Sequence, residues 1–198
     1  FNETNTAYTQ DFDVLGGAEI DPSTDAKTGI LRGSVLPEGW RVERNTTGPR
    51  QVGMYASAVD TATYIGGQSL AKNAYNGIWN FGATGSTDRA IGGLTTGVAN
   101  GTRGVNIMAH LTNDGTTGYA GVEIAYDIEK YRNGNNDAGF TVQLYYSTNG
   151  NTWQSAGDAF KTSYTKDANT EGAAVVPMLT THVMDTLKVD FTAGTDLY

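Results

Sequence analysis

The segment VEIAYDIE, residues 122–129, decides the fold class of this chain. Apolar side chains occupy every second position from Val122 to Ile128, and polar or small side chains fill the positions between them. A strand directs successive side chains to opposite faces, so this period of two predicts a β-strand with one buried face. A helix would need apolar positions that recur three and then four residues apart, and the segment shows no convincing repeat of this kind.

The same alternation recurs in three other segments, at residues 105–111, 140–146 and 187–191. Clusters of Asn, Asp and Gly separate the segments, and these residue types form turns because they cap backbone groups or accept a positive φ. The cluster at 149–151 lies between two strand-like runs and predicts a hairpin over residues 145–153. Weaker strands are predicted at residues 40–44, 52–59, 78–81 and 89–94.

We therefore predict an all-β chain that folds as a two-sheet antiparallel β-sandwich with jelly-roll-like connections, because strands with one dry face pack most simply as paired sheets. The 198 residues fit one such domain, spanning 1–198. Apolar alternation resumes at residues 195–198. We expect that the domain is truncated there, that a closing strand lies at or beyond this end, and that a larger secreted protein contains it.

Composition argues against several classes of protein. The chain has 13 basic and 21 acidic residues, a net charge of −8, and no cysteine. An acidic surface repels phosphate backbones, so nucleic-acid binding is not expected. No segment approaches the roughly 18 consecutive apolar residues that a membrane-spanning helix requires. The absence of cysteine removes disulfides, thiolate metal sites and cysteine nucleophiles together.

Three motifs resemble a family of secreted bacterial β-sandwich domains that occur in large surface or exported proteins. They are LPEGW at 36–40, NFGATGSTDRAIG at 80–92 and YDIEKYR at 126–132. The third departs from the family at Lys130 and Tyr131, where the family usually has Gln and Trp. The resemblance implies a jelly-roll-like fold, a secreted or cell-surface location in a bacterium, and neighbouring domains in the parent protein. It implies no activity and no particular ligand.

Opposite charges accompany these motifs. Asp88 and Arg89 follow a glycine-rich turn, and the third motif contributes Glu129 and Arg132. These four residues could form a polar binding site that hydrogen-bonds the hydroxyls of a sugar. They could equally form a structural network, because buried charges are tolerated when they are paired and hydrogen-bonded. The glycines around Asp88 indicate close backbone packing and favour the structural network.

The acidic row Glu123, Asp127 and Glu129 suggests an enzyme only at first sight. Carboxylates two positions apart on a strand lie about 6–7 Å from each other, a spacing that glycosidases use. One family of sandwich glycosidases carries Glu-x-Asp-x-Glu on such a strand, and Ala125 stands where its nucleophile would be. A solvated acidic strand face explains the row more simply. A glycosidase or lyase is therefore the least favoured function.

Metal binding is a narrow question here. The two histidines, His110 and His182, are isolated in sequence, which argues against a transition-metal site. Calcium prefers carboxylate and carbonyl oxygens, and structural calcium is frequent in jelly rolls. Four aspartates could supply such ligands or could simply cap turns: Asp11, Asp13, Asp21 and Asp25. No other cofactor is predicted.

Aromatic residues suggest a ligand-binding surface. The chain has 11 tyrosines and three tryptophans, and sugar C–H faces stack on such rings while nearby polar side chains bind the hydroxyls. The candidate ligand-binding residues are Trp153, Tyr145, Gln143, Tyr131, Asp127 and Glu123. The leading hypothesis is a non-catalytic extracellular module that binds a glycan or another surface ligand, as carbohydrate-binding and adhesin modules do. The alternative is a structural spacer or assembly domain of a large surface protein.

Overall fold

The computed structural model of the chain is all-β. It describes residues 1–15, 30–31, 36–44, 53–58, 65–66, 78–82, 86–93, 96–98, 101–131, 134, 137–167 and 176–198. The strands are β1 (Ile30–Leu31), β2 (Trp40–Arg44), β3 (Ile65–Gly66), β4 (Ile78–Phe81), β5 (Ala90–Gly93), β6 (Thr96–Val98), β7 (Gly101–Arg103), β8 (Val105–Ala109), β9 (Leu111–Thr112), β10 (Val122–Lys130), β11 (Phe140–Gln143), β12 (Tyr145–Tyr146), β13 (Gln154–Ser155), β14 (Lys161–Tyr164), β15 (Leu179–Leu187) and β16 (Asp196–Leu197). The helices within these ranges are single 3₁₀ turns: η1 (Asp13–Leu15), η2 (Tyr55–Ser57) and η3 (Asp158–Phe160).

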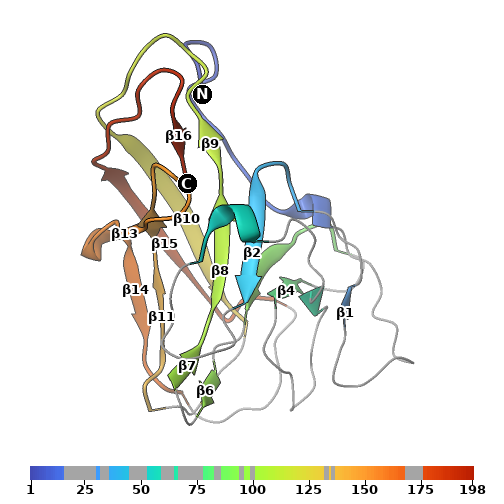
Figure 1. Cartoon of the computed structure of the whole chain (residues 1–198). Coiled ribbons are helices and arrows are strands. Elements are labelled where there is room, and N and C mark those ends of the chain that lie inside the picture. The colour runs from blue at the N-terminus through green and yellow to red at the C-terminus, as the bar shows by residue number, and fades with distance from the viewer. Residues whose placement is uncertain are drawn as a thin grey trace.

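Strands β10 and β15 form one layer of a sandwich-like fold. They pair antiparallel over nine residues, from Val122 opposite Leu187 to Lys130 opposite Leu179. Strands β8 and β9 run one after the other in front of this layer, with β2 beside β8 and β16 beside β9 (Figure 1). The predicted all-β, antiparallel architecture is confirmed, with one parallel pair, β3 and β4, whereas the described pairings do not establish a jelly-roll order of strands.

The second layer extends from β9 and β16 toward β12. Ser147 and Tyr198 exchange backbone hydrogen bonds of 2.9 and 2.8 Å, which join the end of β12 to the end of β16. Strand β9 is contacted from both ends of the described chain. Strand β16 pairs with it, and the Phe1 amino group donates to the Thr112 carbonyl at 2.6 Å. Strands β11 and β14 pair beside this layer.

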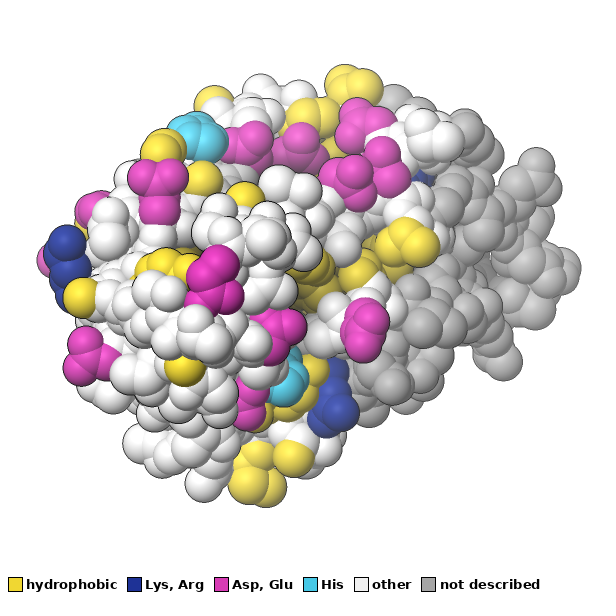
Figure 2. Space-filling model, turned by 90° about the horizontal axis from the view of Figure 1, so that it is seen from above, with side chains coloured by type: hydrophobic (Ala, Val, Ile, Leu, Met, Phe, Trp, Pro, Cys, Tyr) yellow, Lys and Arg dark blue, Asp and Glu magenta, His cyan; other side chains and the backbone are white. Residues whose placement is uncertain are grey.

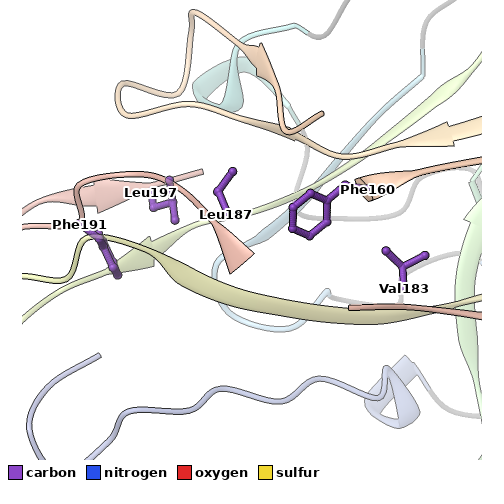
Figure 3. Packing of buried hydrophobic residues seen from close by; sticks show 5 residues of the cluster. All are labelled: Phe160, Val183, Leu187, Phe191 and Leu197. Carbon is purple, nitrogen blue, oxygen red and sulfur yellow. The ribbon is translucent and has the colours of Figure 1, made fainter. Parts of the chain in front are cut away.

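The main core lies between the two layers. The buried side chains Phe160, Val183, Leu187, Phe191 and Leu197 form its centre (Figure 3). Around them pack the inward-facing side chains of β10, which are Val122, Ile124, Tyr126 and Ile128. The alternation that predicted β10 is therefore the alternation between core and surface, with Glu123, Ala125 and Asp127 exposed on the other side.

Strand β8 is an exception to the predicted alternation. Here Asn106 and Met108 are buried and Ile107 is exposed, the reverse of the alternation that the sequence suggests. On the side of Ile107, its cross-strand partner Val42 packs with Leu15 in a smaller core. On the other side, the Asn106 amide donates to Glu43 at 2.7 Å. A polar side chain can be buried here because this hydrogen bond satisfies it.

Three local predictions have different outcomes. The hairpin over 145–153 is confirmed by the pairing of β12 with β13. The strand predicted over 52–59 is wrong, because its described part contains the 3₁₀ turn η2. The strand predicted over 187–191 begins earlier, at Leu179, and ends at Leu187. Only Phe191 continues beyond it as a bridge to Tyr119.

Candidate functional site

The outward side chains of β10 and β15 form an exposed surface, which we call the outer face. Three cross-strand pairs make it up: Glu123 with Thr186, Ala125 with Met184, and Asp127 with His182. Strand pairing places the side chains of each pair next to each other on the same side of the sheet. Acidic side chains are spread over the visible face of the molecule in the view from above, among few basic ones (Figure 2). The outer face combines carboxylates, an imidazole and an apolar pair.

Asp127 and His182 interact directly. The Asp127 Oδ1 atom lies 2.7 Å from His182 Nδ1, and more than half of each side chain is exposed. The neighbouring Met184 is also exposed. An imidazole and a carboxylate held together in this way can donate to and accept from the hydroxyl groups of one ligand. The thioether beside them can contact an apolar surface.

The continuation of the same side of β10 is covered. Tyr131, immediately after β10, is only 7% exposed. Its ring stacks on Phe81 with a centroid distance of 4.7 Å. Its hydroxyl donates to Glu129 Oε2 at 2.7 Å. Burial and the adjacent Glu129 carboxylate raise the pKa of the Tyr131 hydroxyl. Tyr131 is therefore part of the packed interior and does not present its ring to solvent.

Arg89 lies in the same covered region and is 5% exposed. Burial lowers the pKa of its guanidinium, while the electrostatic influence of Tyr131 and Asp88 opposes this shift. Gly82 has φ of +134°, and a Cβ there would lie 2.6 Å from Arg89 Nη1. The glycine of the turn is thus required by the close approach of the guanidinium. The backbone N–H of Arg89 donates to Asp13 Oδ1 at 3.1 Å.

Of the four charged residues considered as a network, the structure brings only some together. Glu129 and Arg89 belong to the covered region through Tyr131. Asp88 is exposed beside Arg89. Arg132 lies outside the described residues. The arrangement resembles a structural network more than a ligand site, because its central guanidinium has almost no contact with solvent.

The predicted ligand-binding residues fall on different sides of the molecule. Glu123 and Asp127 lie on the outer face. Leu144 and Tyr146 pack in the main core from the other layer, so the exposed Tyr145 between them points away from that core on the opposite side. Tyr145 therefore cannot contact the same ligand surface as Glu123 and Asp127.

Gln143 and Trp153 are engaged within the protein. The Gln143 amide donates to the carbonyls of Leu144 and Gly157 at 3.0 and 3.1 Å. The half-buried Trp153 donates its indole N–H to the Gly53 carbonyl at 2.7 Å. Gln143 thus fixes the two ends of the β12–β13 hairpin to each other, and Trp153 fixes the hairpin to Gly53.

The two described candidate calcium ligands bind backbone groups. Asp11 Oδ1 accepts the Asp13 N–H at 3.0 Å, and Asp13 accepts the Arg89 N–H. Asp21 and Asp25 lie outside the described residues. In the part of the chain that the structure describes, no three His, Asp or Glu side chains come together as a metal site. Calcium binding stays a prediction from sequence.

Sequence reasoning missed a cluster around His110. The His110 ring stacks on Tyr198 at 4.5 Å, and its Nε2 lies 3.0 Å from Asp196 Oδ1. Hydrogen bonding from His110, and then from Thr112, lowers the pKa of Asp196. Arg41 lies over the buried ring of Tyr55, 4.4 Å from its centroid. These residues are distant in sequence, so no local motif could have indicated the cluster. It ties β16 and η2 to the junction of β8 and β9.

Comparison with known proteins adds no relative. No family model, curated protein or solved structure matches this chain. Among the described residues, no helix is long and apolar enough to cross a membrane. The resemblance to secreted bacterial domains therefore rests on the three sequence motifs, and the candidate site rests on the geometry of the outer face.

Proposed function

We propose that this chain is a non-catalytic, extracellular β-sandwich module that binds a glycan or another hydroxyl-rich surface ligand through its outer face. The observation that carries the proposal is the exposed Asp127–His182 pair, 2.7 Å apart, next to the exposed Met184. Export to the bacterial surface, and neighbouring domains in a longer protein, are supported by the sequence motifs.

The chemistry of the outer face suits a sugar ring. A sugar presents hydroxyls at its edge and C–H groups on its faces. Asp127, His182 and Glu123 offer acceptors and a donor, while Ala125 and Met184 lie between them in register and offer an apolar contact. The exposed side of the paired strands β10 and β15 gives such a ligand an open face.

Binding without catalysis is supported by the same row of side chains. A retaining glycosidase needs two carboxyl groups about 5–5.5 Å apart across the bond that is cleaved. Ala125 separates Glu123 from Asp127, and the Glu129 carboxylate accepts the Tyr131 hydroxyl in the covered region. This arrangement favours a binding surface over an acid–base pair.

Affinity electrophoresis and a glycan array test the proposal. If the outer face binds, Asp127→Asn and His182→Ala should each weaken binding to retained polysaccharides about tenfold, the effect of losing one charge-assisted hydrogen bond. The matched control is Asp158→Asn, which removes a charge from an exposed residue of η3 in the other layer. Absence of binding across plant, algal and host polysaccharides would contradict the proposal.

A structural spacer or assembly domain is the second candidate. It is favoured by the tryptophans whose side chains are described, because both use their indole N–H groups internally. Trp40 donates to the Tyr8 hydroxyl and Trp153 to the Gly53 carbonyl, each at 2.7 Å. Under this function Trp153→Phe should lower stability, and outer-face variants should change neither stability nor any binding.

A further inference from the structure

Lys130 occupies an unusual position for a lysine. It continues the inward-facing row of β10, after Ile124, Tyr126 and Ile128, and its side chain is only 12% exposed. Lysine is almost never buried unless it is paired, because removing its charge from water is costly. A specific partner should therefore be present at this site.

That partner is Asp167, which follows β14. The Lys130 Nζ atom is in direct contact with Asp167 Oδ2, and the Asp167 side chain is 31% exposed. The backbone fixes both residues: the Lys130 carbonyl accepts the Met178 N–H, and the Asp167 N–H donates to the Gly134 carbonyl, each at 2.8 Å. The amine and the carboxyl group are thus held together by the fold and shielded from much of the solvent.

We propose that Lys130 and Asp167 condense into an intramolecular amide, a covalent crosslink between the ends of β10 and β14. A proton passes from the ammonium to the carboxylate within the pair, which leaves a neutral amine and a neutral acid. The nitrogen lone pair attacks Asp167 Cγ, the C–O bond breaks, and the oxygen leaves as water with the proton released by nitrogen. No oxidant, reductant or other reactant is needed.

Proximity and limited solvation are the physical reasons for the reaction. Groups held in reactive contact reach effective concentrations on the order of 10⁵ M or more, which can reverse the usual preference for hydrolysis in water. Partial burial also keeps bulk water away from the pair, which disfavours hydrolysis of the amide once it has formed. The crosslink would close the chain from residue 130 to residue 167, a loop that contains β11, β12, β13 and β14.

A second lysine–aspartate contact provides an internal control. Lys166 and Asp137 also touch, but their side chains are 59% and 87% exposed. Water surrounds this pair and stabilises its ions, so it should remain a salt bridge. The two pairs share the same chemical groups and differ in burial.

Intact-mass spectrometry of the purified, unfolded full chain tests the proposal. We expect the wild-type mass to be one water below the mass calculated from the sequence. Lys130→Arg keeps the charge and should show its full calculated mass, whereas Lys166→Arg should still lack one water. In a tryptic map, the peptides that contain Lys130 and Asp167 should appear joined, with no cleavage after Lys130.

Two results would overturn the proposal. One is a wild-type chain with its full calculated mass, which would leave Lys130–Asp167 as an ion pair only. The other is a loss of water that maps to a different residue, such as a succinimide at another aspartate. The wild-type measurement decides the matter even if Lys130→Arg does not fold. The crosslink does not involve the outer face, so the crosslink can be absent while ligand binding is observed.

Discussion

Asp127 and Glu129 are successive members of the outward row of β10, yet they meet opposite surroundings. Asp127 is exposed and pairs with His182 across the sheet. Glu129 accepts the hydroxyl of the buried Tyr131, in a region where Phe81 and Arg89 cover the strand. One strand face therefore has an open half and a covered half. Carboxylates in the covered half serve packing, whereas those in the open half are available to a ligand.

The charge of a side chain on a strand does not by itself indicate its role. The acidic residues of β10 look equivalent in sequence, and their roles are set by what Phe81, Arg89 and Tyr131 cover. A charged group in a covered region must be paired, and its loss leaves an uncompensated partner. An exposed pair contributes little to stability because water screens it. Substitutions in the two halves should therefore affect different properties.

The largest expected effect is that of Arg89→Ala in the covered half. Removing one member of a buried charged network should lower the free energy of unfolding by about 3 kcal/mol. Urea denaturation followed by tryptophan fluorescence measures the change. The neighbouring exposed residue provides the control, because Asp88→Ala should change the free energy by less than about 0.5 kcal/mol. Equal effects at both positions would show that Arg89 is not the centre of the covered half.

Tyr131→Phe should have a smaller effect in the same region. It keeps the ring on Phe81 but removes the hydrogen bond to Glu129, which should lower the free energy of unfolding by about 2 kcal/mol because the acceptor is charged. The matched control is Tyr145→Phe, which removes an exposed hydroxyl from the other layer. If both variants are as stable as wild type, the Tyr131–Glu129 contact does not support the fold.

Asp127→Asn in the open half should leave stability nearly unchanged. An exposed ion pair is worth at most about 1 kcal/mol, so the unfolding midpoint in urea should shift only slightly. The proposed ligand affinity should fall in the same variant. A large loss of stability without any change in binding would place Asp127 in the structural network and remove the distinction between the two halves.

The smallest expected effect concerns a carboxylate outside both halves. The Glu3 carboxylate accepts hydrogen bonds from Thr116 and Thr117, which lower its pKa from 4.5 to about 2. A folded-state pKa below the unfolded value means that this stabilisation is present above about pH 4.5 and is lost as the pH falls toward 2. Thermal unfolding of Glu3→Gln against wild type, from pH 7 to pH 2, should show the difference shrinking with acidification.

The sequence predicted the elements whose two faces differ in polarity. Strand β10 is the clearest example, because its apolar residues face the core and its polar residues face water. The start of strand β15 was not predicted, because its first half lacks a clear alternation of apolar and polar residues. Thr180, His182 and Met184 all lie on its exposed side, although one of them is apolar. The reversed burial in β8 also escaped prediction, because it depends on the hydrogen bond between Asn106 and the distant Glu43.

The candidate site was predicted only in part. Glu123 and Asp127 were recognised from their positions on β10, but His182 was set aside as an isolated histidine. Its role depends on the register that brings it opposite Asp127, which lies 55 residues away in sequence. Strand register between distant segments is a tertiary property, so a local pattern could not supply it. For the same reason Tyr145 was grouped with residues that lie on the other side of the molecule.

The position of β9 has a consequence for how the chain folds. This short strand accepts the amino group of Phe1 on one side and pairs with Asp196 and Leu197 on the other. These partners lie about 195 residues apart in the sequence, so the entropy of closing a long loop must be overcome before the contacts form. The second layer therefore cannot be completed until Asp196 and Leu197 have been synthesised. Folding of this layer should be slow and should wait for the whole described chain to be available.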